Sequence, residues 1–253
     1  MHRYFDIFNN AFRTYLVDDY IEVDEYAMIF STITKDPIWN AANKLKIEEN
    51  DTAEAIIDIE LLFANHKTNP CFWVSSADHP RFIDAVLKDK GYAFTGTCNW
   101  MIHKTVQNYQ ITGDTSPLFI KPLETEQDAI DFITVYSRVH ADPQGIFKEF
   151  FMKKVMDRTF KLTNRLFIGY ENGVPVVLTG YVMYEKTAVA HSLTVITDRE
   201  ESNYGTIMAA YALHNCPSEQ MLALPWLQSK EETLYKAIGF EDLMHVKLFT
   251  KNW

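Results

Sequence analysis

The chain has 253 residues, 47% of them apolar, and a formal net charge of -10 at pH 7. This size and composition are typical of one large or two ordinary globular domains, and they exclude a disordered or fibrous chain. The acidic charge and the lack of a Lys and Arg cluster argue against nonspecific nucleic-acid binding, which requires neutralisation of phosphates.

The cysteines Cys71, Cys98 and Cys216 are widely spaced and form no CxxC pair, so they predict reduced thiols rather than a disulfide framework or a zinc site. No apolar run approaches the roughly 20 residues that span a bilayer. The amino terminus also lacks the basic and apolar regions of a secretory signal. We therefore expect a cytoplasmic protein that binds neither nucleic acid nor membrane and holds no metal.

In the first half, apolar spacing and turn residues predict several short elements. In chain order these are a helix after Tyr4, a strand at 26–33, a turn at 36–40, a helix at 51–65, a strand at 71–74, a helix at 78–90 and a strand at 94–103. Residues 105–118 are polar, rich in turn residues and without periodicity. We place the boundary between two domains there, with residues 1–110 in the first and residues 118–253 in the second.

The second half contains a strong hairpin signal, because Asn172-Gly173 separates two apolar runs. Thr125 and Asp128 fit a helix capping box loosely, since Glu or Gln is the usual third residue. The predicted elements are strands at 119–123, 166–170, 174–184, 188–196, 221–224 and 240–250, and helices after Thr125 and at 145–158, 204–215 and 231–238.

The stretch from Leu193 to Met208 predicts a strand, a polar loop with the single glycine Gly205, and a helix. The first turn of a helix has backbone N–H groups without intrahelical partners and a partial positive charge. This loop is therefore a candidate for holding an anion such as a pyrophosphate.

The two halves end alike. Leu87–Tyr92 and Tyr235–Phe240 each place a helix, a capping glycine and an aromatic residue before a strand. This weak internal repeat indicates two related units in tandem, although such junctions are also common by chance.

The order of elements from residue 118 onward resembles that of the GNAT acetyltransferase superfamily. The motifs that carry the resemblance are the hairpin at 166–177, the stretch from Leu193 to Met208, and Thr233–Phe240 with its Tyr-x-x-x-Gly-Phe ending. The first half resembles the degenerate amino-terminal unit of tandem members. The resemblance implies an α/β (α+β) fold with two GNAT-like units, each a mixed, mostly antiparallel sheet flanked by helices.

The resemblance also implies a cofactor, acetyl-coenzyme A, bound along one strand and the loop that follows it. The residues that match are Leu193, Thr194, Val195, Ser202, Asn203, Tyr204, Gly205 and Thr206. Asn203 stands at a glycine position, which Asn tolerates because it visits positive φ more readily than most residues. Glu200 stands where the family carries Arg or Gln, and Arg199 offers a substitute one position earlier.

Family chemistry is acetyl transfer to an amine, here of a small molecule or peptide. By resemblance, the Val195 N–H polarises the thioester carbonyl and Tyr235 is the general acid, with the alternative that Tyr235 packs in the core. His191 is a weaker candidate for a base that acts through water. Glu200 and Asn203 also leave open a GNAT-like pseudoenzyme that senses a ligand or binds a protein.

Further residues near the carboxy terminus carry weaker signals. We interpret Glu231-Glu232 as a solvated pair that favours a helix start, because carboxylates are stabilised at the positive end of the helix dipole.

Overall fold

The computed structural model describes residues 1–111, 117–140, 146–155 and 157–252. These residues form two compact units, which we describe separately. Unit 1 comprises Met1–Trp100, Pro225–Leu227 and Leu243–Trp253, and unit 2 comprises Met101–Leu224 and Gln228–Asp242. Of the predicted linker, residues 112–116 lie outside the described residues, as does Gly145 at the start of a predicted helix.

Unit 1 is built on strands in the order β1-β2-β3-β4-β11-β5. Its elements are α1 (His2–Phe12), β1 (Asp19–Glu22), β2 (Ala27–Phe30), β3 (Ala41–Asn43), α2 (Thr52–Asn65), β4 (Cys71–Ser75), α3 (Ile83–Asp89), the first part of β5 (Ala93–His103) and the last part of β11 (Glu241–Thr250). The prediction missed β1 and β3, because each is very short and neither has the β-branched alternation that marks a strand.

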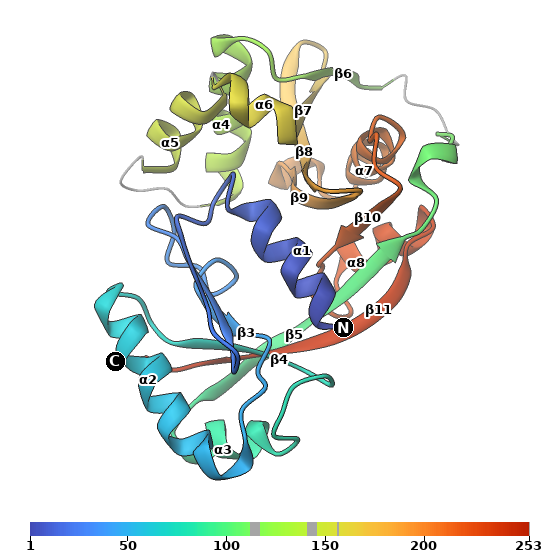
Figure 1. Ribbon diagram of the computed structural model, residues 1–253. Helices are drawn as coiled ribbons and strands as arrows, with labels where there is room; N and C mark the ends of the chain where they lie inside the picture. Colours follow the sequence, from blue (N-terminus) through green and yellow to red (C-terminus); the bar gives the residue numbers. More distant parts are fainter. Residues whose placement is uncertain (112–116, 141–145, 156, 253) are drawn as a thin grey trace. The chain divides into compact units, whose positions relative to one another are not determined.

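Strand β4 shows how the core of unit 1 forms. All five of its residues are buried, as expected of a strand covered on both faces. Phe72 and Val74 pack with Ile56 and Phe63 of α2, whereas Trp73, on the opposite face, packs against Phe8 of α1 with ring centroids 5.2 Å apart. Figure 1 shows α1 on one side of these strands and α2 and α3 on the other.

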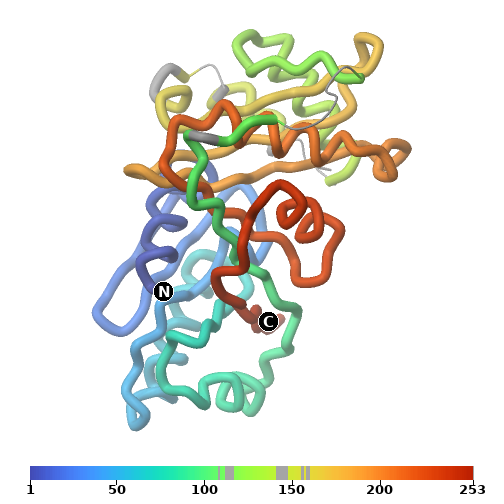
Figure 2. The backbone as a smooth tube through the Cα atoms, turned by 90° about the vertical axis from the view of Figure 1, so that its right-hand side faces the viewer, coloured from blue at the N-terminus to red at the C-terminus, as the bar shows by residue number. Residues whose placement is uncertain are grey.

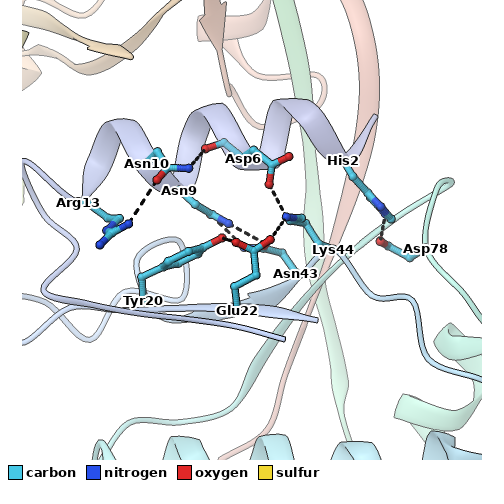
Figure 3. Close-up of polar contacts among 10 residues, drawn as sticks. All are labelled: His2, Asp6, Asn9, Asn10, Arg13, Tyr20, Glu22, Asn43, Lys44 and Asp78. Carbon is cyan, nitrogen blue, oxygen red and sulfur yellow. Dashed lines mark hydrogen bonds and ion pairs between the residues drawn. The ribbon is translucent and has the colours of Figure 1, made fainter. Parts of the chain in front are cut away.

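A polar cluster lies under α1 (Figure 3). Lys44 has φ +56° and a side chain only 8% exposed, and its Nζ donates to the carboxylates of Asp6 and Glu22. Tyr20 donates its hydroxyl hydrogen to Glu22 at 2.6 Å. The Lys44 and Tyr20 hydrogen bonds lower the pKa of Glu22.

We expect Lys44→Met to destabilise the protein by about 1–2 kcal/mol, because it leaves two neighbouring carboxylates without their shared cation. The cost is limited because both carboxylates are nearly half exposed. Urea denaturation at pH 7 measures it, with Lys186→Gln, at an exposed ion pair, as the control. Equal midpoints for the two variants would show that the cluster contributes little to stability.

Unit 2 is built on strands in the order β5-β10-β9-β8-β7-β6. Its elements are β6 (Phe119–Pro122), α4 (Glu126–Val139), α5 (Ile146–Val155), α6 (Arg158–Thr163), β7 (Asn164–Glu171), β8 (Val174–Tyr184), β9 (Thr187–Val195), α7 (Tyr204–His214), β10 (Gln220–Ala223), α8 (Lys230–Ala237) and the end of β5. The hairpin prediction is confirmed, since Asn172 and Gly173 both have positive φ between β7 and β8.

The units differ from the predicted domains at the carboxy terminus. Residues 243–253 belong to unit 1, because Val246–Thr250 of β11 pairs antiparallel with Cys71–Ser75 of β4. In unit 2, Met101–His103 of β5 pairs antiparallel with β10. Unit 1 thus includes β11, which follows α8, the last helix of unit 2. Unit 2 includes the end of β5, which follows α3, the last helix of unit 1. A sequence pattern cannot reveal this exchange, since either strand suits either sheet.

Two helix predictions also need correction. The helix expected at 145–158 corresponds to α5, and the separate helix α6, which starts at Arg158, was not predicted; the helix expected at 78–90 begins only at Ile83. Conversely, the loosely matched capping box is fully formed at the start of α4, with Thr125 and Asp128 each bonding the other's backbone N–H. Within the described residues, no helix combines the length and apolar character needed to cross a bilayer.

Candidate functional site

The end of strand β9 departs from regular pairing. Leu178 of β8 pairs with Thr194 and Gly180 pairs with His191, so Ser192 and Leu193 together oppose one residue of β8. Ser192 has φ +57°, as the extra residue of a β-bulge often requires. The bulge changes the direction of the last residues of β9 relative to the sheet.

Beyond the bulge, the backbone of Val195 faces away from β8. The Ile196 N–H donates to the Val176 carbonyl at 3.0 Å, so the paired residues Val195 and Val177 exchange no hydrogen bonds with each other. The parallel pairing of β9 with β10 runs from Thr187 to Val189, and Val195 lies beyond it. The Val195 N–H therefore points toward space that β10 does not fill.

The first turn of α7 is suited to an anion. Asn203 is its N-cap residue, but its side chain makes no capping hydrogen bond. Ser202 accepts a hydrogen bond from the Tyr204 N–H at 3.3 Å, and the next N–H groups belong to Gly205 and Thr206. Uncapped N–H groups and the helix dipole together favour a negative charge at this position.

An open cavity of about 400 Å³ lies against this turn. Its lining comes from the end of β9, the loop before α7, the first turn of α7 and helix α8, a course that Figure 2 shows in orange to red. The lining residues are Leu193, Val195, Glu200, Ser202, Gly205, Thr206, Lys230, Glu231, Thr233, Leu234 and Ala237.

Gly205 allows the helices to approach closely. A Cβ atom there would lie 3.0 Å from Cδ1 of Leu234 and 3.5 Å from Cγ2 of Val195. A bulky side chain at this position would crowd Leu234 and Val195, which both line the cavity.

One of the three charged residues that line the cavity in the described chain, Lys230, is ion-paired. Lys230 bonds Glu201 at 2.6 Å, and the Glu201 side chain is 90% exposed, so this carboxylate lies in solvent. Glu200 lines the cavity itself. Arg199 bonds Glu171 at 2.8 Å and does not line the cavity, so it does not take the basic position that a one-residue shift would give it.

The interpretation of Glu231-Glu232 as a solvated pair is wrong. Glu232 is 4% exposed, accepts a hydrogen bond from the Gln228 N–H and bonds Lys236 at 2.6 Å. Glu231 lines the cavity, and burial raises its pKa to about 7. A carboxyl group with this pKa can take up and release a proton near neutral pH.

Five of the eight residues predicted to bind the cofactor line the cavity: Leu193, Val195, Ser202, Gly205 and Thr206. The other three do not line it. Thr194 is buried beside His140, with 3.3 Å between Oγ1 and Nε2, and Tyr204 donates its hydroxyl hydrogen to Glu171. Asn203 has φ -83°, so the expected positive φ is not used. Lys230, Glu231 and Leu234 were missed because nothing in the sequence links α8 to the loop before α7.

The two predicted catalytic side chains lie outside the cavity lining. Tyr235 is 3% exposed, its ring packs on Phe240 at 4.9 Å, and burial raises its pKa well above the ordinary value. His191 is buried, its Nδ1 lies 2.8 Å from Ser192 Oγ, and burial lowers its pKa to about 3. Such a histidine stays neutral at pH 7 but accepts a proton poorly.

The catalytic role of Tyr235 stays a prediction with a direct test. If the Tyr235 hydroxyl is the general acid, Tyr235→Phe lowers kcat roughly 100-fold and leaves KM unchanged. Steady-state kinetics on an accepted amine measures both parameters, with the melting temperature as a control for packing. An unchanged kcat would assign Tyr235 to the core.

No family profile and no curated protein sequence matches this chain. Solved structures do. A GCN5-related N-acetyltransferase from Kribbella flavida is 9% identical, with TM-score 0.71, over 93% of this chain and 90% of that one. Another from Sphaerobacter thermophilus is 8% identical, with TM-score 0.67, over 90% of this chain and 80% of that one.

A tandem GNAT protein from the clavulanic acid biosynthesis pathway is 11% identical, with TM-score 0.60, over 90% of this chain and 78% of that one. At these identities the similarity is one of fold. The chain has the fold of the GCN5-related N-acetyltransferases, and the predicted mixed, mostly antiparallel sheet flanked by helices is confirmed.

Proposed function

We propose that unit 2 binds acetyl-coenzyme A and transfers its acetyl group to an amine of a small molecule or peptide. The observation that carries the proposal is the cavity formed where the Val195 backbone turns away from β8 and the uncapped first turn of α7 begins. The fold shared with acetyltransferases supports the same reaction class.

The residues of the cavity fit the parts of such a cofactor. The N–H groups of Gly205 and Thr206, with the Lys230 ammonium, are suited to phosphates. Leu193, Val195 and Leu234 provide an apolar wall for a narrow chain. Glu200 opposes phosphate binding, and Lys230 partly offsets this repulsion. When bound, acetyl-coenzyme A would supply an electrophilic thioester.

In this proposal, the Val195 N–H would hold the acetyl carbonyl oxygen and would stabilise negative charge there. The Glu231 carboxylate would take one proton from the incoming ammonium, since its pKa of about 7 suits a base at neutral pH. The amine nitrogen would then form the amide bond as the carbon–sulfur bond breaks, and its second proton would go to the departing thiolate. The net charge of -10 favours the approach of a cationic amine.

Isothermal titration calorimetry with acetyl-coenzyme A tests the first step. We expect saturable binding to the full chain, and no heat at about 1 mM ligand would exclude the proposal. Detection of coenzyme A in the purified protein by native mass spectrometry would support it independently.

We expect Glu231→Gln to remove a pH dependence. If Glu231 is the base, the kcat of the wild-type protein rises as pH increases through about 7, because the carboxylate form increases. The variant should have a lower kcat without this rise. The raised pKa also means that folding binds a proton. The wild type should therefore lose stability relative to the variant as pH rises from about 4.5 to about 7.

Kinetics and urea denaturation from pH 5 to 9 measure the two effects. Glu201→Gln, at the exposed partner of Lys230, is the matched control and should change neither profile. A wild-type pH profile in the Glu231 variant would remove the residue from the mechanism.

The position of Glu200 favours a second function, a pseudoenzyme that senses a ligand or binds a protein. A carboxylate that lines the cavity weakens phosphate binding. The two proposals differ in turnover: an enzyme releases coenzyme A with at least one member of a panel of primary amines, and a pseudoenzyme binds without release.

We also propose that the two units are tandem copies of one fold. In unit 1, β2 pairs antiparallel with β3, which pairs in parallel with β4; in unit 2, β8, β9 and β10 repeat this pattern. In unit 1 the loop after β3 carries Glu48, Glu49 and Asp51, which disfavour phosphate. Acetyl-coenzyme A should therefore bind with a stoichiometry of one.

A further inference from the structure

A second cavity of about 500 Å³ lies in unit 2, on strands β6 to β8 and near the carboxyl end of α7. The strand register explains its wall. Arg165 of β7 is paired directly with Tyr181 of β8, and Phe167 is two residues along β7. Side chains at these positions project from the same face of a sheet. None of the residues that line the first cavity lines this one.

Aromatic side chains make the walls rigid. The Tyr211 ring of α7 meets Phe167 edge to face, with centroids 5.4 Å apart. Tyr181 is 1% exposed and donates its hydroxyl hydrogen to the Asn215 carbonyl at 3.0 Å. Phe160, in the middle of α6, also lines the cavity. Walls of this kind suit a flat ring, because aromatic pairs stack or meet edge to face at these separations.

The positively charged side chains of the cavity favour an anionic ligand. Lys161 and Arg165 both line it, and neither forms an ion pair with a carboxylate in the part of the chain that the structure describes. The Lys161 Nζ donates instead to the Glu124 backbone carbonyl at 3.2 Å. These two cations place local positive charge at the cavity in a chain whose net charge is -10. The Glu124 carboxylate, the only acidic side chain in the described lining, reduces the local excess to about one positive charge.

We infer that this second cavity binds an aromatic monocarboxylate, with its ring between Tyr211 and Phe160 and its carboxylate at Arg165 and Lys161. A planar guanidinium pairs with a carboxylate through two parallel hydrogen bonds, which adds direction to the charge attraction. The volume is within the range of small-molecule sites. The inference does not depend on acetyl transfer.

The second cavity lies at the opposite end of α7 from the proposed cofactor site. Gly205 lines the first cavity and Asn215 the second, and ten residues of helix correspond to about 15 Å. Occupation of each cavity can therefore be measured separately.

Fluorine NMR of 4-fluorobenzoate with the full chain tests the inference. We expect the ligand signal to broaden saturably, and Arg165→Gln to weaken binding at least about 10-fold. Lys161→Gln should weaken it less, because a lysine contributes a single charge without the fork geometry.

Arg165 is exposed, so its replacement should leave the fold intact, which circular dichroism checks. Lys186→Gln, at an exposed ion pair of the same unit, is the matched control and should bind like the wild type.

Three neutral or differently charged probes complete the test. Binding of 4-fluorobenzyl alcohol and of 4-fluorobenzylamine should be at least about 10-fold weaker than that of the carboxylate, and phenyl phosphate should not compete better than benzoate. The inference is overturned by no broadening at about 10 mM 4-fluorobenzoate, by equal binding of the amine, or by an Arg165→Gln variant that binds like the Lys186→Gln control. Tighter binding of phenyl phosphate would overturn the monocarboxylate class.

Discussion

Replacing Gly205 with valine is expected to weaken acetyl-coenzyme A binding by roughly 30- to 100-fold. The valine Cβ would lie 3.0 Å from Leu234 Cδ1, and its two methyl groups would occupy the cavity beside the first turn of α7. The loss of one or two charge-assisted hydrogen bonds to phosphate, at about 1.5–3 kcal/mol each, accounts for a change of this size. Isothermal titration calorimetry measures it.

Two further variants separate obstruction from misfolding. Gly205→Ala should lower affinity only slightly, because Leu234 Cδ1 is the end of a flexible side chain and can shift by a few tenths of an ångström. The double variant Gly205→Val with Leu234→Ala removes the crowded contact and should recover part of the binding. Equal affinities for the valine variant and the wild type would show that ligand binds elsewhere.

The sequence predicts the location of the cavity because local patterns define two of its walls. A β-branched strand, a loop and a glycine before an apolar helix are all local signals, and Val195, Ser202 and Gly205 do line the cavity. The hairpin at Asn172-Gly173 is predicted equally well, since positive φ at two successive positions has few sequence solutions.

The third wall of the cavity could not be predicted from local patterns. Helix α8 is separated from α7 in sequence by β10, and only the parallel pairing of β9 with β10 returns the chain to the same end of the sheet. The helical repeat then determines which residues of α8 line the cavity. Lys230, Leu234 and Ala237 follow one face at i, i+4 and i+7, and Tyr235 lies off that face. A motif fixes the spacing of Tyr235 from Phe240, but not the direction of its ring.

The exchange of β5 and β11 was unpredictable for a related reason. Alternating and apolar residues specify a strand and its buried face, but the partner strand is set by topology and loop length. Because β11 spans residues of both units, a boundary drawn at the polar segment 105–118 cannot divide the chain in two.

Asp128→Ala is expected to destabilise the protein by about 2–3 kcal/mol at pH 7. Asp128 is 1% exposed, and its Oδ2 accepts hydrogen bonds from the backbone N–H groups of Glu124 at 3.0 Å and Thr125 at 2.9 Å. Its carboxylate also pairs with Lys121. Burial alone would raise the pKa of Asp128, but Lys121 and these N–H groups outweigh burial and lower it from 3.8 to about 2. A shift of this size corresponds to about 2 kcal/mol.

The pH dependence identifies the charged part of this contribution. A carboxyl group whose pKa is lowered by folding stabilises the folded state above its unfolded pKa, so the contribution is complete above about pH 4 and is lost as pH falls toward 2. Asp128→Asn keeps one acceptor without the charge, and its difference from the wild type should shrink over the same range. Glu126→Ala, at an exposed position in the same helical turn, should cost only a few tenths of a kcal/mol. Urea denaturation from pH 2 to 7 distinguishes these outcomes. A difference between Asp128→Asn and the wild type that does not change with pH would mean that the cap acts through its geometry alone.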